Sequence, residues 1–582
     1  MHFGQLCQRL CRKKNIPTGD QSTRLRRCLS TFDITLIAIG HMVGSGIYVL
    51  TGAVVRNQTG PSIVLSFLLA GFASFLSALC YGEFGARVPK AGSAYSYTYV
   101  SLGEIWAFII GWNIILEHVV GSAAVARSWS GYLDSLLGHS ISNATLERVG
   151  HLREHSSNLF GDYPDILAFL VILIIGAFVA LGSRTSTNLN TIFTIINMIV
   201  VGIVVVFGFM YADFSLWSGD DERGVSRFFP YGVSGMLSGA ASCFFAYIGF
   251  DGLATAGEEA KNPETAIPLA TFISMSVVTL AYILMSSALT LMIPYYRVNP
   301  TAAFSDAFAQ RGAWFANLAV SVGALSGMTT SLVGGMFALP RCVYSMAEDG
   351  LLFESLAYVS STQVPINAIV VFGSLTAVTA LLFDIETLVE FLSIGTLMAY
   401  SIVSASVIVL RYQPAKLPES DTWDNGGRLR CDLPGKAYFE SEPGSSIYCS
   451  ITAIIVSFGV ISFSISSGFY ESTFGFVVVS IAAIVSLLVF IFICLHYQNT
   501  AQLSFKVPLV PLIPCLSLFI NILMMTHLAP LTWVRLVVWM SIGFLIYFCY
   551  AIKHSKEELG NAEKFSRSNT YDSVVTASTL QD

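Results

Sequence analysis

The segment AIGHMVGSGIYVLTG, residues 38–52, places Gly44 and Gly46 inside an apolar stretch that runs from about residue 32 to residue 55. This stretch is long enough to cross a bilayer, which takes roughly 20 apolar residues as a helix. Glycine weakens a helix, and broken backbone in hydrocarbon is tolerated only where protein or a polar cavity surrounds the freed amides and carbonyls. The segment therefore predicts a membrane helix that is interrupted beside a cavity.

A second interrupted helix is expected at FFAYIGFDGLATAG, residues 244–257, where the sequence from Gly249 to Gly252 divides the apolar stretch 232–256. Two broken spans in corresponding positions of the two halves of a chain are typical of a secondary transporter and mark its binding site. The pattern predicts a carrier. The alternative is that the glycines serve only the close packing of neighbouring helices, which is the usual role of small residues in membrane spans.

The composition supports an integral membrane protein. Of 582 residues, 54% are hydrophobic and 12% are charged, with a mean hydropathy of +0.66. The formal net charge of -6 is uninformative, because the placement of Lys and Arg, and not their total, sets topology. We find no nucleophile–base set, P-loop, metal-ligand spacing or basic nucleic-acid-binding face. The sequence therefore predicts neither an enzyme nor a nucleic-acid-binding protein, and no cofactor or metal.

Apolar windows of about twenty residues predict an all-α integral membrane protein with about fourteen transmembrane helices. The windows lie near residues 32–55, 62–85, 102–132, 164–182, 188–212, 232–256, 268–294, 314–346, 366–383, 387–411, 447–468, 474–496, 507–528 and 531–552. The first and the sixth contain the breaks. We therefore expect spans 1–5 and 6–10 to be inverted repeats that form a LeuT-like ten-helix core, with four additional helices outside it.

The predicted organisation has five parts: an N-terminal tail (1–30), the transport core (31–411), a polar loop (412–446), four additional helices (447–552) and a C-terminal tail (553–582). The tails and the loop are too polar and too short to form a second domain. Lys and Arg gather in segments that this topology places on one side, so both ends are expected in the cytosol.

Two N-x-[ST] sequons, at Asn57 and Asn143, fall in loops that the same topology places outside the cell. Such triplets are acceptors for N-glycosylation in exposed extracellular segments. The sequence therefore predicts a glycoprotein.

Many longer stretches resemble one known family. Among them are IGHMVGSGIYVLTGAV, YGEFGARVPKAGSAYSYTYVSLGEIWAFIIGWN, CFFAYIGFDGLATAGEEAKNPETAIP and ALPRCVYSMAEDGLL, in a resemblance that covers about residues 24–556. The chain resembles the cationic amino acid transporters of the amino acid-polyamine-organocation superfamily, and within them looks most like the type-four branch. The resemblance implies a fourteen-span protein of the plasma membrane that transports arginine, lysine and ornithine by facilitated diffusion.

The expected site suits a free amino acid, whose α-carboxylate and α-ammonium match the amides and carbonyls freed by a broken helix. By resemblance to the superfamily, the amides of residues 44–46 should hold the carboxylate, and carbonyls at both breaks should face the ammonium. Phe245 also matches the aromatic residue that covers bound substrate as a gate. The substrate-binding residues expected at the breaks are Met42, Val43, Gly44, Ser45, Gly46, Phe245, Ala246 and Ile248.

Glu117 is the residue expected to bind the side chain of the cargo. It lies thirteen positions beyond Glu104, so a rise of 1.5 Å per residue places it about 20 Å into the membrane. An ionised carboxylate there is costly unless it is paired, and a guanidinium or ammonium of the substrate would pair it. The alternative is a protonated Glu117 hydrogen-bonded inside the bundle. His118, about 100° further around the helix, is expected to face another surface.

Four further residues complete the expected site. Asp251 should pair with freed amides of the second break, as a structural residue first and a pathway residue second, and Ser393 should line the pocket. Arg341 lies at an inner span end, where it would either form an ion pair of an inner gate or belong to a solvated rim at the membrane surface. Asn197 is the main polar group of span 5, which contains no ionisable residue. Proton-coupled members of the superfamily carry a Lys in that span, so no obligatory proton coupling is expected. The membrane potential, about 2.3 kcal/mol per charge per 100 mV, would drive a cationic cargo.

Two departures from the family pattern keep other functions open. Well-studied animal relatives have Ser-Tyr where this chain has Glu117-His118, and the segment after span 8, residues 347–365, lacks the Lys and Arg of relatives. One alternative is a carrier of neutral amino acids. Another is a transport-inactive member that acts as a sensor or through partners. No accessory subunit is expected.

Overall fold

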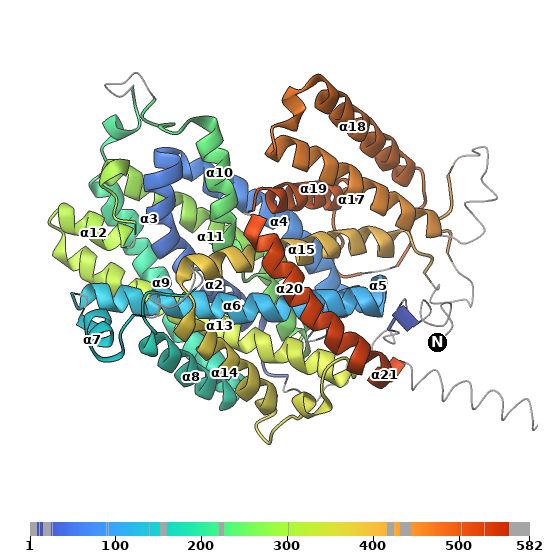
Figure 1. Cartoon of the computed structure of the whole chain (residues 1–582), viewed down its shortest axis with the longest axis horizontal. Helices are drawn as coiled ribbons and strands as arrows, with labels where there is room; N and C mark the ends of the chain where they lie inside the picture. Colours follow the sequence, from blue (N-terminus) through green and yellow to red (C-terminus); the bar gives the residue numbers. More distant parts are fainter. Residues whose placement is uncertain are drawn as a thin grey trace, which may run out of the picture.

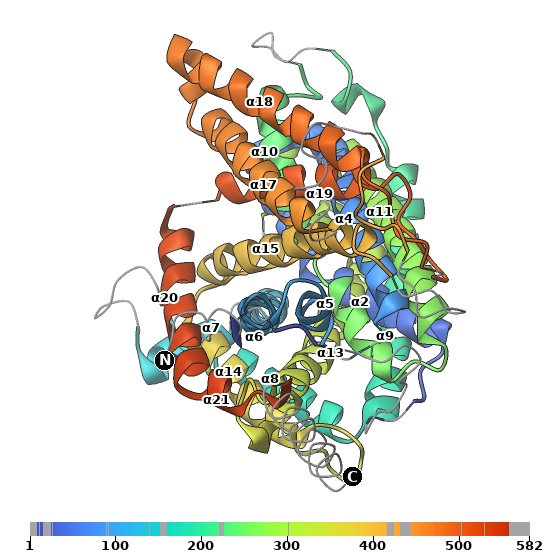
Figure 2. The same ribbon diagram turned by 90° about the vertical axis from the view of Figure 1, so that its right-hand side faces the viewer.

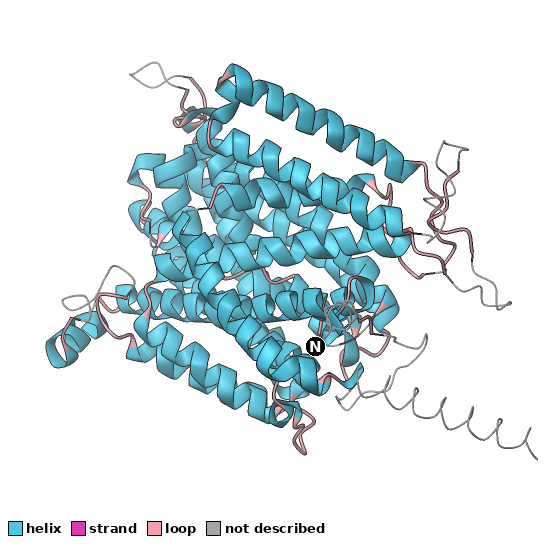
Figure 3. Ribbon diagram, turned by 45° about the vertical axis from the view of Figure 1, so that its right-hand side comes forward, coloured by secondary structure: helices cyan, strands magenta, loops and turns pink. Residues whose placement is uncertain are grey.

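The structure is a computed structural model that describes residues 9–10, 12–14, 25 and 27–557, except 89, 91, 139, 152–159, 220–225, 301, 416–423, 431–443, 502 and 529. Long helices make up most of the described chain (Figures 1 and 3). Much of the expected tails and of the loop 412–446 lies outside the described residues.

The first half of the core begins with the interrupted first span. Its elements are α2 (Thr31–Met42), η1 (Gly46–Leu50), α3 (Thr51–Val54), α4 (Ile63–Arg87), α5 (Ala94–Ser101), α6 (Glu104–Leu136), α7 (Ser140–Val149), α8 (Ile166–Ala180) and α9 (Ser183–Met210). The second half begins with the interrupted sixth span. Its elements are α10 (Gly232–Phe244), η6 (Phe245–Tyr247), η7 (Asp251–Glu258), α11 (Pro263–Met292), α12 (Ala303–Gln310), α13 (Trp314–Glu348), α14 (Ile366–Leu382) and α15 (Ile385–Arg411).

The additional helices follow the loop. They are α17 (Ser445–Ser466), α18 (Thr473–Cys494), α19 (Leu512–Thr526), α20 (Pro530–Ile546), η11 (Tyr547–Ala551) and α21 (Ile552–His554). Ten helical stretches of the described chain are long and apolar enough to cross a membrane, and one of them, residues 31–87, contains two of the expected spans. Three shorter apolar helices, α8, α14 and α19, coincide with three more. The all-α membrane fold is confirmed.

Burial distinguishes the central helices from the peripheral ones. Of the most apolar part of each helix, 89% is buried in α6 and 83% in α13, but only 11% in α18. Figure 2 shows α6 nearly end-on, with the other core helices around it. An apolar helix that is exposed on most sides is suited to lipid contact, so α18 lies at the lipid-facing edge and α6 and α13 form the centre.

The helix contacts follow a pattern of two five-helix repeats. Each of three helices packs against its counterpart in the other half: α4 against α11, α6 against α13, and α8 against α14. The contact of α9 with α13 is matched by that of α15 with α6, and the contact of α2 with α11 by that of α10 with α4. Because five is odd and successive spans alternate in direction, the second repeat enters the membrane from the opposite side.

The four additional helices attach to the core in two places. Helices α17, α18 and α19 stack together on one side of the core, where α19 contacts α4 and α15 (Figures 1 and 2). Helix α20 packs separately against α6 and α15. The additional helices therefore do not form one separate unit.

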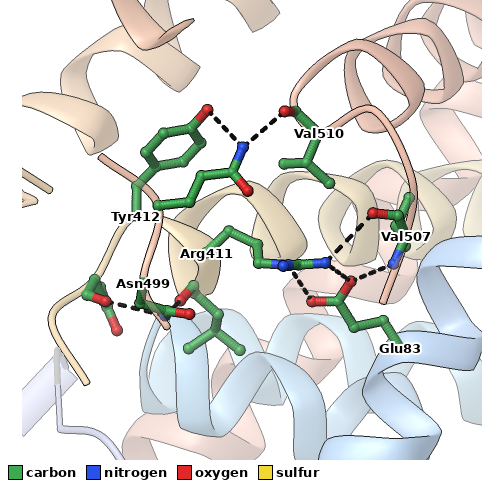
Figure 4. Close-up of polar contacts among 9 residues, drawn as sticks. Glu83, Arg411, Tyr412, Asn499, Val507 and Val510 are labelled. Carbon is green, nitrogen blue, oxygen red and sulfur yellow. Dashed lines mark hydrogen bonds and ion pairs between the residues drawn. The ribbon is translucent and has the colours of Figure 1, made fainter. Parts of the chain in front are cut away.

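A buried ion pair joins α19 to the core (Figure 4). Arg411, at the end of α15, donates from Nε to Oε1 of Glu83 at 2.8 Å and from Nη2 to Oε2 at 3.0 Å. Val507, shortly before α19, donates its amide to Oε2 of Glu83 at 2.7 Å and accepts from Nη2 of Arg411 at 3.3 Å. We call Glu83, Arg411 and Val507 the joint.

Segments near both ends of the chain meet on one face of the core. Arg12 forms an ion pair with Glu104 at 3.3 Å, and Ser555 donates to the same carboxylate at 2.6 Å. Lys14 forms an ion pair with Asp349 at 2.6 Å. Burial is the largest single influence and acts to lower the pKa of Lys14, but the carboxylates of Asp349, Glu348 and Glu258 together outweigh it and hold this pKa above its usual 10.5. The described part of the N-terminal tail is therefore held against the helix ends.

Candidate substrate-binding site

The first break is a tight turn held by α9. Helix α2 ends at Met42, and at Val43 (φ -81°, ψ 80°) the amide of Gly44 donates to the carbonyl of Met42 at 2.9 Å, as in an inverse γ-turn. The side chain of Asn197 donates to the carbonyl of Val43 at 2.8 Å and accepts from the hydroxyl of Tyr48 at 2.7 Å. Asn197 thus bridges the two sides of the break.

The second break is more open. Helix α10 passes into the short turn η6, Ile248 is extended (φ -62°, ψ 135°), and Gly249 adopts a φ of +124°, a conformation that favours glycine. The carboxylate of Asp251 accepts from the amide of Gly249 at 3.2 Å and from the hydroxyl of Tyr400 at 3.2 Å. Asp251 therefore binds a freed amide of this break and ties it to α15.

The two breaks touch each other. A Cβ at Gly46 would lie 2.5 Å from the Cα of Ala246, so glycine is needed there for close packing. The hydroxyl of Tyr282, on α11, lies 2.7 Å from the carbonyl of Met42 and 2.9 Å from that of Ala246. One side chain therefore supports both breaks.

A cavity of about 50 Å³ lies where the breaks meet α6, α13 and α15. By the same measure one water needs roughly 10–15 Å³, so the cavity has room for several waters. Its lining consists of His41, Met42, Ser45, Gly46, Glu117, His118, Gly121, Ser122, Val125, Phe245, Ala246, Ile248, Ser331, Gly335 and Leu392.

Seven of the substrate-binding residues expected from the sequence line this cavity: Met42, Ser45, Gly46, Glu117, Phe245, Ala246 and Ile248. Val43 and Gly44 belong to the first break but not to the lining. Ser393 lies in α15, and its side chain is outside the described part of the structure.

Glu117 is buried in the cavity wall without a partner. Its residue exposure is 2%, and neither carboxylate oxygen has a hydrogen-bond partner among the described residues. It forms no ion pair with any described Lys, Arg or His. Thr396 is close to it, but the geometry assigns the hydroxyl of Thr396 to the carbonyl of Leu392, at 3.3 Å. The cavity thus contains an unpaired acceptor.

The expectation that His118 faces another surface is wrong, since its side chain lines the cavity beside Glu117. Two neighbouring rows of residues on α6 line the cavity: positions 117 and 121 form one row, and positions 118, 122 and 125 form the other. Two rows separated by about 100° can share a wall when the cavity curves around the helix.

Three polar residues of the lining were missed by sequence reasoning. His41, in the last turn of α2, lies with its ring centroid 6.3 Å from that of His118, at 70° between the planes. Ser331 donates to the carbonyl of His41 at 2.8 Å, and Ser122 lies near Gly335 across the cavity. The signal for His41 was its position in IGHMVGSG, directly before the break.

Arg341 is not part of the cavity lining. It is completely buried, and donates from Nε to Glu259 at 2.9 Å and from Nη2 to Ser183 at 3.0 Å. Its guanidinium lies 3.7 Å from the ring centroid of Phe337. These contacts join α13 to the end of the interrupted sixth span and to the start of α9.

The two sequons differ in accessibility. Asn143 is exposed on α7. Asn57 is also exposed, but Thr59 of its sequon is completely buried and donates to the carbonyl of Val54 at 3.2 Å. The sequon at Asn143 is therefore the more accessible one.

Two interrupted helices that meet at a polar cavity define a membrane carrier. Comparison with known proteins agrees: residues 29–513 match the family described as amino acid permease, and residues 505–555 match the C-terminus of that family. This chain belongs to the amino acid permease family and, within it, to the cationic amino acid transporters.

The similarity to known proteins extends along nearly the whole chain. A human protein named cationic amino acid transporter 4 is 43% identical, over 95% of this chain and 92% of its own length. A mouse protein of the same name is 44% identical over the same shares. An Arabidopsis thaliana protein named cationic amino acid transporter 4, vacuolar, is 32% identical over 94% of this chain and 96% of its own length.

Proposed function

We propose that this protein transports cationic amino acids, namely arginine, lysine and ornithine, by alternating-access uniport driven by the membrane potential. The observation that carries the proposal is Glu117: a buried carboxylate in the cavity wall with neither a hydrogen bond nor an ion pair in the described structure. The names of the relatives support the same cargo.

A cationic side chain would supply the charge that Glu117 lacks. Taking an ion out of water costs several kcal/mol, and an opposite charge in good geometry offsets this cost. Arginine can offer two parallel donors to one carboxylate, and lysine a single ammonium. A neutral side chain offers neither.

The backbone of the cargo would lie between the two breaks. Ser45 and Gly46 line the cavity at the start of η1, and the N-terminal end of a helical segment attracts a carboxylate. The amide of Gly44 is bonded within the turn, so we assign the carboxylate to Ser45 and Gly46. The ammonium would face the carbonyls of Ala246 and Ile248, and Phe245 would cover it.

We place the protein in the plasma membrane with both ends in the cytosol. The segments that contain Arg12 and Ser555 meet on one face of the core, and Lys and Arg are most frequent in the segments assigned to that face. The sequon at Asn143 would then lie outside the cell, where it can be glycosylated.

The test is uptake of labelled arginine into proteoliposomes that contain the purified protein, with the potential set by a potassium gradient. Lysine should compete and leucine should not, and an inside-negative potential should increase uptake. Glu117→Gln removes the charge but keeps the shape. It should weaken arginine binding by about 2–5 kcal/mol, which is roughly 30-fold or more.

Glu471→Gln is the matched control, because it removes an exposed carboxylate outside the cavity. Equal competition by leucine, together with an unchanged Glu117→Gln variant, would identify a neutral amino acid carrier. No uptake of any amino acid by correctly folded protein would identify a transport-inactive member. Either result rejects the proposal.

A further inference from the structure

Two imidazoles face the proposed cargo position. His41, on α2, and His118, on α6, both line the cavity and meet edge to face, with ring centroids 6.3 Å apart. Residue exposure of His118 is 4%, and its Nε2 has no hydrogen-bond partner in the described chain. Glu117, the next residue along α6, is also unpartnered. We call His41 and His118 the imidazole pair.

Glycines leave the space that His41 occupies. A Cβ at Gly249 would lie 2.9 Å from the ring of His41, a Cβ at Gly252 would lie 3.1 Å from it, and a Cβ at Gly334 would lie 2.7 Å from it. Two of these glycines belong to the second break and one to α13. The imidazole of His41, beside the first break, is thus packed directly against the second break. A movement of either break therefore changes this contact.

The charged and titratable groups around the pair are mainly acidic. Asp251, beside the second break, is close enough to act electrostatically on His41. Glu117 lies beside His118 on α6. The other ionisable groups that act on these carboxylates are the hydroxyls of Tyr81 and Tyr400 and the thiol of Cys342, which are uncharged at neutral pH.

A proton is a small cation that this arrangement can hold. Imidazole is the one side chain whose unperturbed pKa places its change of charge near physiological pH. A protonated imidazole pair would supply a positive charge to Glu117, which the cationic side chain of the cargo supplies otherwise. The imidazole pair lies in spans 1 and 3. The expectation of no obligatory proton coupling was based on span 5, which is a different part of the chain.

We propose that the imidazole pair binds a proton in competition with the cationic side chain of the cargo, so that Glu117 is neutralised by one or the other. This inference rests on the proposed function. It predicts a change of selectivity: acidification excludes arginine and admits a neutral amino acid of the same shape, because the proton then occupies the place of the cationic charge. The proton comes from water, and no covalent bond to the cargo forms or breaks.

The experiment measures uptake of labelled arginine and of citrulline, its uncharged analogue, by proteoliposomes with equal pH on both sides and a fixed potential. As the pH falls below the pKa of the pair, the KM for arginine should rise by up to about tenfold per pH unit, because proton and cation exclude each other. The KM for citrulline should fall over the same range.

Variants identify the group responsible. His118→Gln and His41→Gln should each reduce the pH dependence of the arginine KM, whereas His527→Gln, at an exposed position outside the cavity, should keep it. A pH-independent arginine KM in the wild type overturns the inference. So does a pH dependence that persists unchanged in both cavity variants.

A second measurement does not depend on any variant. Calorimetric titration of the purified wild-type chain with arginine, in buffers of different ionisation enthalpy, counts the protons released on binding. Release of a proton near the pKa of the pair supports the competition. Arginine binding without proton release or pH dependence rejects this inference alone, and no binding of any amino acid at any pH rejects the proposed function with it.

Discussion

The joint between the core and α19 offers a sharp test of how the additional helices are held. The side chains of Arg411 and Glu83 are 6% and 2% exposed, so solvent screens their attraction little. Replacing Arg411 by Met leaves Glu83 buried, with the amide of Val507 as its hydrogen-bond donor in the joint and with the Arg87 cation close enough to act on it electrostatically. Breaking a buried pair in this way costs about 3–5 kcal/mol. Glu83→Met leaves the guanidinium without a carboxylate and with the carbonyl of Val507 as its remaining partner in the joint, and a similar loss is expected.

Removing both charges should cost less than removing one. In Glu83→Met/Arg411→Met neither charge of the pair remains, and replacement of a whole ion pair by apolar residues is often neutral. The amide of Val507 then loses its acceptor, which costs about 1–3 kcal/mol. We therefore expect the double variant to be less destabilised than either Arg411→Met or Glu83→Met.

Unfolding of the purified protein by sodium dodecyl sulfate, followed by circular dichroism, measures these free energies. The joint contains no residue of the cavity lining, so the KM for cargo should be unchanged in every variant that folds. A double variant that loses the sum of the two single losses would refute the reasoning, because it would show that the pair contributes no coupling.

Three further predictions concern other parts of the molecule. Gly46→Ala overpacks the contact between the breaks, so it should lower the free energy of unfolding by about 1–3 kcal/mol and reduce uptake. Gly131→Ala should be tolerated, because there is open space around its Cβ. Unfolding and uptake assays compare the two variants. Lys14 has a raised pKa, so the charge that it contributes to the ion pair is fully present below pH 10.5 and is lost as the pH rises through the folded-state pKa. The rate of limited proteolysis of the N-terminal segment should therefore be constant between about pH 6 and about pH 9. The rate should be higher in Lys14→Met. Asn143→Gln should abolish the loss of mass on glycosidase treatment of protein from animal cells, and Asn57→Gln should not, because the Thr of its sequon is buried.

The fold could be predicted because two simple constraints determine most of it. Hydrocarbon thickness sets the length of each apolar window, and the cost of unpaired backbone groups restricts where a span can break. The windows and both breaks follow from local sequence alone. The attachment of α19 does not, because it depends on Arg411 meeting Glu83, which is 328 positions away in the sequence.

The site could be predicted less completely, for a similar reason. Glycine and an unpaired acidic residue in a span are visible locally, so the positions of the breaks and of Glu117 were accessible. The direction of each side chain around a break was not. His41 faces the cavity because glycines of the second break and of α13 leave room for its ring, and His118 does so because the cavity contacts two rows of α6.

Which backbone groups remain available to a ligand depends on residues from other spans. The hydroxyl of Tyr282 has one proton, but the carbonyls of Met42 and Ala246 are both within hydrogen-bond distance of it. The carbonyl of Met42 also accepts from the amide of Gly44. When Tyr282 donates to Met42, the carbonyl of Ala246, at the cavity wall, keeps an acceptor position for an ammonium. Tyr282 can thus bond the first break to α11 while it leaves the carbonyl of Ala246 for the cargo. Because the close packing of the breaks comes from Gly46 against Ala246, tight packing and binding between the breaks are compatible.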